Sequence, residues 1–132
     1  MPKNFNNYVA DITSCGTVSI YCRSTELDSI DIGTGKIVQC SVDELGSTLT
    51  KCRGVDGVSV TFEGTEEDVI RVTKLLNIQV VSDYMLDGLV VTCGASARIR
   101  GGVVVDGNAV NVQIAYNNGT VTVGSPLILG DY

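Results

Sequence analysis

The sequence predicts a mainly β protein with a minor helical part: an antiparallel sandwich or barrel of short strands, with one helix near residues 66–76. Two Phe and no Trp leave an aliphatic core, and Val dominates the apolar positions. Valine is β-branched and therefore favours pleated strands. The apolar runs of the last third are separated by Asp106-Gly107 and Asn118-Gly119, pairs that favour tight hairpin turns.

The length and the cysteine content indicate one domain in a reducing compartment. A chain of 132 residues fits a single core, so we expect one domain over residues 1–132. The start of the chain has no apolar run typical of a secretory signal, and no segment is long enough to span a membrane as a helix. Five widely spaced Cys and no His favour free, buried thiols over disulfides or a zinc site.

The first half of the chain is expected to form short strands separated by glycines. Gly is the commonest residue at turns, and Gly16, Gly33 and Gly35 interrupt the apolar runs. The predicted strands are residues 8–12, 17–22, 27–32, 36–42 and 48–53.

The middle of the chain carries the helix signal. Thr65, followed three residues later by Asp68, resembles a capping box with Asp in place of Glu. Acidic residues in the first turn favour the positive end of the helix dipole. Apolar residues then recur at helical spacing, which predicts a helix over residues 66–76. Alternating runs at 58–62 and 78–81 predict flanking strands.

The last third is typical of a β-meander. In residues 109–116, Val110, Val112 and Ile114 alternate with polar or small residues, so they should share one face. Pro126 should end the regular pairing. The predicted strands are 86–92, 97–100, 103–105, 109–116 and 120–123, with a final short strand at 127–129.

The residue types used by the commonest enzyme mechanisms are missing. Without His, a Ser-His-Asp triad and a Cys–His pair are excluded. Residues 33–36 resemble part of a phosphate-binding loop, but Ile37 stands where Ser or Thr is required, which favours a turn. The acidic residues at 63–68 lack calcium-loop spacing, and a solvated helix start explains them. We therefore predict no enzyme and no catalytic, cofactor-binding or metal-binding residues.

The charge distribution argues against nucleic-acid and membrane partners. The net charge is −6, and no stretch of the chain clusters Lys or Arg. A basic patch is the usual electrostatic signature of binding to phosphates or to anionic lipid surfaces. We therefore expect neither nucleic acid nor membrane as a partner.

The last third of the chain is almost uncharged. Residues 1–87 hold seven basic and thirteen acidic side chains, whereas residues 88–132 hold only two of each. Uncharged strands with exposed edges pair readily with other chains, and soluble monomers usually protect such edges with Lys, Pro or bulges. We therefore expect these strands to find their hydrogen-bonding neighbours in other copies of the chain.

Self-association leads to our main functional hypothesis, a structural subunit of a homo-oligomeric assembly. The composition resembles that of bacteriophage virion components such as tail, baseplate or head–tail connector subunits, so other assembly proteins are further candidate partners. The protein would be cytoplasmic, or part of the virion after assembly. The expected interface residues are Arg98, Arg100, Val112, Ile114, Val121 and Val123.

Two other classes of function remain as alternatives. The first is a cytosolic β-barrel or sandwich module that binds a small ligand or a protein partner. The second is an enzyme that uses only carboxylates or Lys, for which clustered Asp and Glu lining one cleft would be the sign. The size of the particle in solution separates the first alternative from the main hypothesis.

Overall fold

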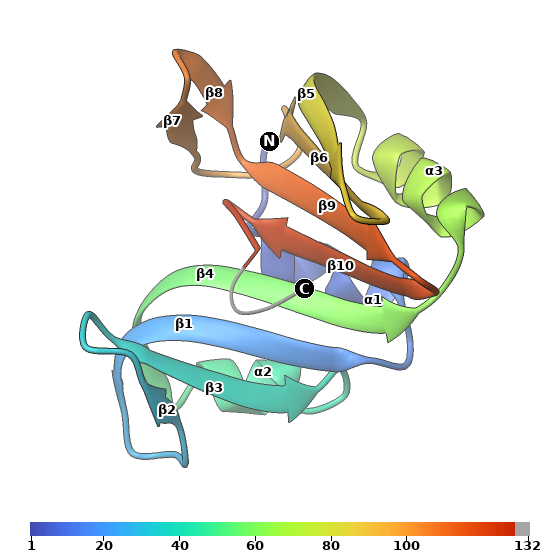
Figure 1. Ribbon diagram of the computed structural model, residues 1–132. Helices are drawn as coiled ribbons and strands as arrows, with labels where there is room; N and C mark the ends of the chain where they lie inside the picture. Colours follow the sequence, from blue (N-terminus) through green and yellow to red (C-terminus); the bar gives the residue numbers. More distant parts are fainter. Residues whose placement is uncertain (129–132) are drawn as a thin grey trace.

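The computed structural model describes residues 1–128, with only the backbone at Leu86, and is built on one large antiparallel sheet (Figure 1). The order of its eight strands is β2-β3-β1-β4-β10-β9-β6-β5, and β7 and β8 form a separate hairpin. The strands are β1 (Thr17–Thr25), β2 (Ile30–Asp31), β3 (Lys36–Ser41), β4 (Cys52–Glu63), β5 (Ile78–Leu86), β6 (Leu89–Ser96), β7 (Val103–Val105), β8 (Asn108–Val110), β9 (Val112–Asn117) and β10 (Thr120–Ser125). The helices are η1 (Phe5–Tyr8), α1 (Val9–Ile12), α2 (Leu45–Leu49) and α3 (Glu66–Leu75).

The predicted fold class is confirmed as a mainly β, antiparallel, sandwich-like α+β fold. Within the described residues the two outermost strands, β2 and β5, do not pair with one another, so the sheet is open and does not close into a barrel. The chain crosses from β4 to β5 through α3, and three other strands lie between these two.

The main core lies on one face of the sheet, which we call the helix face. Alternating residues of the central strands point to this face, because successive side chains of a strand point to opposite sides. Phe5, Val9, Leu45 and Val72 of the helical segments pack there. The fully or nearly fully buried strand residues of this core include Val18, Ile20, Cys22, Val38, Val60, Val112, Ile114, Val121 and Val123.

The second face of the sheet carries a smaller apolar cluster and several buried polar groups. Val91 and Ala115 are buried on it, and Ile128 packs against them after the chain turns back beyond β10. The N–H of Ile128 donates to Oε1 of Gln113 at 2.9 Å. Oγ1 of Thr61 and Oγ1 of Thr122 lie 3.1 Å apart on neighbouring strands. The end of the described chain therefore covers part of this face.

The structure confirms the helix at residues 66–76 within one residue, and it corrects several strand predictions. Residues 8–12 are helical, since Val9 and Ile12 both face the core at helical spacing. Residues 48–53 contain the end of α2 and only the start of β4. Residues 97–100 form no strand, although Ile99 makes an isolated bridge to Lys3. Of the short strand predicted at 127–129, residues 127 and 128 are not strand, and Leu129 lies outside the described residues.

Both hairpin turns predicted from Asp-Gly and Asn-Gly are present. Asp106 and Gly107 adopt positive φ between β7 and β8, and Asn118 and Gly119 do so between β9 and β10. Asn and Gly tolerate this left-handed conformation, which two-residue hairpin loops require. The predicted strand 109–116 is divided at Asn111, whose amide bonds the backbone of Ser96 and Ile99.

The expectation that the last strands pair with other copies is wrong for β9 and β10. Strand β10 lies between β4 and β9, and β9 lies between β10 and β6, so both are paired on each side within the chain. Val112, Ile114, Val121 and Val123 are at most 1% exposed. Val112, Val121 and Val123 form the core rather than an interface, because the chain already encloses their side chains. Ile114 also belongs to the core, and it reaches the surface only at the floor of the groove described below.

This assignment predicts a large difference between two valines of the same region. Val121→Ala should lower the free energy of unfolding by about 2 kcal/mol, through lost burial and the cavity that remains. Val104→Ala is the control, because Val104 is 74% exposed, and the change there should stay within about 0.5 kcal/mol. Urea unfolding monitored by circular dichroism measures both. Equal effects of the two substitutions would contradict the described core.

Candidate interaction surface

An apolar groove of about 330 Å³ lies between α3 and the β5–β6 hairpin. Two of its lining side chains are large, apolar and exposed: Ile70 of α3 is 55% exposed and Met85 of β5 is 74% exposed. Adjacent exposed apolar side chains of this kind mark interaction sites on soluble proteins. The residues that line this groove, called the apolar groove below, are Glu66, Val69, Ile70, Met85, Val90, Thr92, Ile114 and Tyr116.

The position of α3 on the sheet leaves the groove open. The helix packs most closely through Val72 and Leu76 at its C-terminal end, which are fully buried. Val69, one turn earlier, is only half-buried, and Ile70 points away from the core. The floor is formed by Ile114 and Tyr116 of β9, on the helix face. The N-terminal half of α3 therefore forms one wall of the groove instead of closing over it.

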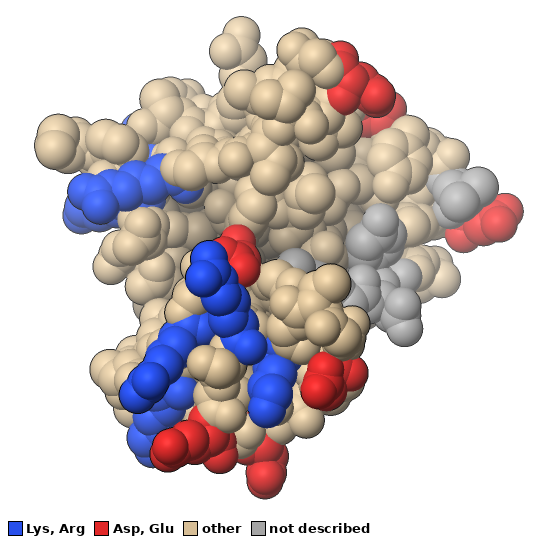
Figure 2. All heavy atoms as spheres, turned by 90° about the vertical axis from the view of Figure 1, so that its left-hand side faces the viewer, with Lys and Arg blue, Asp and Glu red and all other residues tan. Residues whose placement is uncertain are grey.

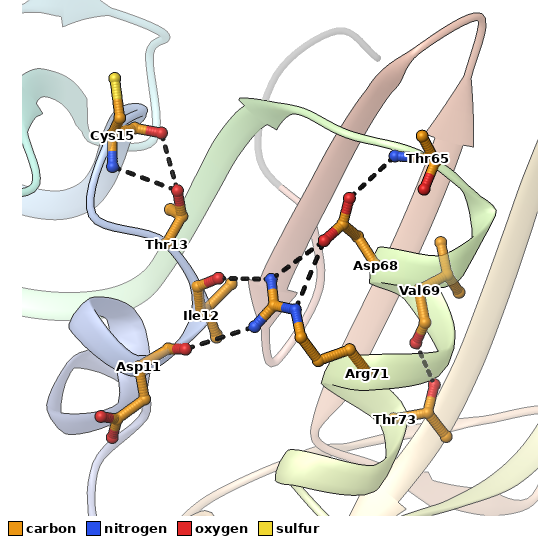
Figure 3. A network of polar contacts seen from close by, with 9 residues as sticks. All are labelled: Asp11, Ile12, Thr13, Cys15, Thr65, Asp68, Val69, Arg71 and Thr73. Atoms are coloured by element: carbon orange, nitrogen blue, oxygen red, sulfur yellow. Dashed lines mark hydrogen bonds and ion pairs between the residues drawn. The ribbon is translucent and has the colours of Figure 1, made fainter.

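Arg71 holds α3 against the N-terminal segment (Figure 3). Its guanidinium donates to the backbone carbonyl of Ile12 at 2.7 Å and to that of Asp11 at 3.4 Å, at the C-terminal end of α1. A cation is favoured there by the helix dipole. The same guanidinium lies 3.3 Å from Oδ1 of Asp68, and Oδ2 of Asp68 accepts from the N–H of Thr65 at 2.9 Å. Asp68 thus links Thr65, at the start of α3, to Arg71, which anchors the helix to the N-terminal segment.

Strand β5 ends the sheet beside the groove. It has nine residues and pairs with β6 along its length, with a bulge between Val80 and Ser82. Asp83 is its only charged residue, and Val80 is 48% exposed. A long edge strand with few charges is a template for pairing with another chain, although its bulge provides some protection.

The opposite edge of the sheet, formed by β2 and β3, is better protected against pairing with another chain. Strand β2 has only two residues and covers the end of β3 at Lys36 and Ile37. At the other end of β3, the N–H and Oγ of Ser41 both donate to Oε1 of Glu44, at 3.3 and 2.8 Å. These two hydrogen bonds lower the pKa of Glu44, because they stabilise its ionised form. Of the two margins, β5 is therefore the one more open to a partner.

The two arginines predicted at the interface lie on the surface, away from the groove. The carbonyl of Arg98 accepts from the N–H of Lys3 at 2.9 Å and from the hydroxyl of Tyr8 at 3.1 Å. Nε of Arg100 donates to the carbonyl of Pro2 at 3.0 Å. Both side chains are exposed. They therefore fix the N-terminal residues while leaving positive charge accessible.

Of the residues that line the groove, only Ile114 was identified from the sequence as an interface residue. The strand predicted at 78–81 stopped before Met85, because residues 82–86 lack clear alternation. Ile70 carried a usable signal, since it falls outside the apolar face of the helix that contains Val69 and Val72. An isoleucine on the solvent side of a helix is a signal for a contact surface.

The five cysteines are all free thiols, and all lie within residues 1–128. Only Cys22 and Cys93 are buried, so the expectation of buried thiols is wrong for Cys15, which is exposed. Burial raises the pKa of the Cys40 thiol, and burial together with the neighbouring Cys22 raises that of Cys52. A raised pKa lowers the fraction of reactive thiolate at neutral pH.

The other hollows on the surface differ in the residues that line them. One of them, of about 670 Å³, is lined by Glu26 as well as by Lys51 and Arg53, so opposite charges share it. Among residues 1–128, no three His, Cys, Asp or Glu side chains converge so that they could hold a metal ion. Within the same residues, none of the helices has the length and apolar character needed to cross a bilayer.

The anchoring of α3 generates a prediction for Asp68. Asp68→Ala should lower the free energy of unfolding by about 1–2 kcal/mol, because the Thr65 N–H and the Arg71 guanidinium both lose a charged acceptor. Glu67→Ala is the matched control, since Glu67 is an exposed acid in the same helical turn. Thermal unfolding of the two variants measures the difference, and equal melting temperatures would contradict the anchor.

The thiol environments generate a second prediction. At pH 7, iodoacetamide should alkylate Cys15 fastest, because it is exposed, and Cys15→Ser should remove the fast phase. The reaction of Cys40 and Cys52 should accelerate as the pH rises towards their raised pKa values, since the thiolate is the nucleophile. Mass spectrometry of the native protein over time measures each site. Rapid alkylation of Cys22 at pH 7 would contradict its burial.

Comparison with known proteins adds no family to this description. No protein-family model matches the chain, and neither the curated proteins nor the solved structures include a significant match to it.

Proposed function

We propose that this protein is a structural subunit that assembles with copies of itself through the apolar groove and the adjoining edge of β5. The observation that carries the proposal is the coincidence of two features in one corner of the molecule. One is the edge strand Ile78–Leu86 with a single charged residue, and the other is the exposed apolar pair Ile70 and Met85. Edge strands and apolar patches are each recurrent sites of protein association.

The contrast between the two sheet margins supports this choice of surface. On the opposite side, β2 covers only the first two residues of β3 and Glu44 bonds Ser41 at its end, whereas β5 offers an edge of nine residues. A second copy that adds a strand to β5 would extend the sheet through backbone hydrogen bonds and would bury Val80. The apolar groove supplies burial beside this strand contact, so the two features reinforce one another.

The kind of assembly is proposed from composition. A small β-rich chain with one principal helix, rich in Val, Thr, Asn and Gly, suits a bacteriophage virion component such as a tail, baseplate or head–tail connector subunit. Such particles are built from many copies that repeat the same contact, and an open sheet edge would provide a contact of this kind. This part of the proposal rests on analogy with the class of protein.

The proposal predicts particles larger than one chain. Native mass spectrometry over a range of concentrations should give masses at multiples of 13.9 kDa. Val80→Lys should raise the dissociation constant by about tenfold or more, because a charge on an edge strand disfavours strand addition. Val55→Lys is the control: Val55 is 40% exposed on β4, away from the groove, and this variant should assemble as the wild type does.

A wild-type protein that stays monomeric at every concentration would contradict the proposal. That result would favour the alternative module that binds a small ligand or a different protein, and the apolar groove would then be its binding site. Assembly that Val80→Lys and Val55→Lys weaken equally would also count against the β5 edge, because a general effect of added charge would explain it.

A further inference from the structure

The hairpin formed by β7 and β8 projects from the sheet and is called the β7–β8 arm below (Figure 1). Its two strands pair only with one another among the described residues, with Val104 opposite Ala109. Val105 and Val110 pack with the apolar cluster of the second face. Val104 points the other way and is 74% exposed, and Ala109 beside it is exposed as well. The arm therefore presents a small apolar surface to solvent.

The arm and the apolar groove lie on opposite faces of the same strands. Val91 and Ala115 belong to the cluster beneath the arm, whereas their neighbours Val90 and Ile114 line the groove. Successive residues of a strand point to opposite faces. Figure 1 also places the arm and α3 at opposite sides of the molecule. The arm cannot reach the groove of its own chain, so only a second copy can bring the two together.

The root of the arm and the rim of the groove carry opposite charges, and the tip of the arm carries one acid, Asp106. The arm begins directly after Arg98 and Arg100, and the bridge between Ile99 and Lys3 adds a third exposed cation there. In Figure 2 a small group of Lys and Arg side chains lies in the upper half, the half that holds the arm in Figure 1, whereas the larger group lies in the lower half beside Asp and Glu side chains. The groove lies at the acidic start of α3, where Glu63, Glu66 and Glu67 are exposed. Opposite potentials on two surfaces steer association and set its orientation.

We propose that the β7–β8 arm of one copy docks into the apolar groove of the next, with Val104 inserted between α3 and β5. The inference rests on the proposed function and names its interface. The basic residues at the root of the arm then face the acidic rim of the groove. Each copy offers one arm and one groove, so the contact is head-to-tail and propagates into a closed ring or an open filament.

Two variants that each disable one half of the contact test this interface. Val104→Glu places an acid on the arm, and Met85→Glu places one in the groove; both positions are 74% exposed, so both variants should fold. Each variant alone should be monomeric by native mass spectrometry. An equimolar mixture should form a 1:1 heterodimer, because the intact arm of one variant meets the intact groove of the other. Ile30→Glu is the control and should assemble as the wild type does, because Ile30 is 58% exposed on β2, at the opposite edge of the sheet.

The outcomes separate this inference from the proposed function. A monomeric wild type overturns both. A Val104→Glu variant that assembles as the wild type does overturns the arm contact and leaves self-assembly standing. A mixture that remains monomeric, while each variant is folded by circular dichroism, also overturns it, because an arm and a groove would then both be present without binding.

Charge reversal tests the orientation of the contact. Arg98→Glu should raise the dissociation constant about tenfold, and Glu66→Arg in the same chain should restore most of the affinity, because the two ends of the contact again carry opposite charges. The wild-type dissociation constant should also rise with salt concentration. No recovery in the double variant would overturn the pairing of the arm root with the acidic rim.

Discussion

The structure depends on one constraint, the burial of alternating aliphatic side chains against the helical segments on a single face of the sheet. Strands β1, β4, β9 and β10 all place Val or Ile on that face, and the N-terminal helices, α2 and α3 cover it. Burial of aliphatic area is the main favourable term in folding. Because the covering elements come from widely separated parts of the chain, this one core brings the N-terminal segment, the middle and the last strands together.

The shortage of charge in the last third follows from this core. Strands β9 and β10 occupy the middle of the sheet, with strands on both sides and cover on both faces, and ionised side chains would be costly there. The polar residues that do occur are bonded: Asn111 holds the backbone of Ser96 and Ile99, and Gln113 bonds Ile128 and the Cys93 thiol. The low charge thus reflects central position, and the chain itself supplies the pairing.

The same arrangement leaves apolar surface at two places. The helix face is not fully covered at the β5 end, because α3 is anchored by Arg71 to the N-terminal segment and packs mainly through Val72 and Leu76. On the opposite face, the β7–β8 arm buries Val105 and Val110 and thereby turns Val104 outward. One feature is concave and acidic at its rim, and the other is projecting and basic at its root. Their complementarity is the reason for our proposal that a second copy of the chain occupies the groove.

The sequence by itself determined the local features. Asp-Gly and Asn-Gly specify hairpins through the conformations that these residues tolerate, and Thr65 with Asp68 specifies the start of α3, so both could be predicted. The strand predicted at residues 8–12 was wrong, because a few apolar residues in a short segment fit the periodicity of a helix as well as that of a strand. Only the tertiary structure decided the strand order, the burial of Val112 and Val121, and the groove at Ile70 and Met85. These depend on which distant segments pair and pack, and long-range pairing leaves no signal in a local pattern.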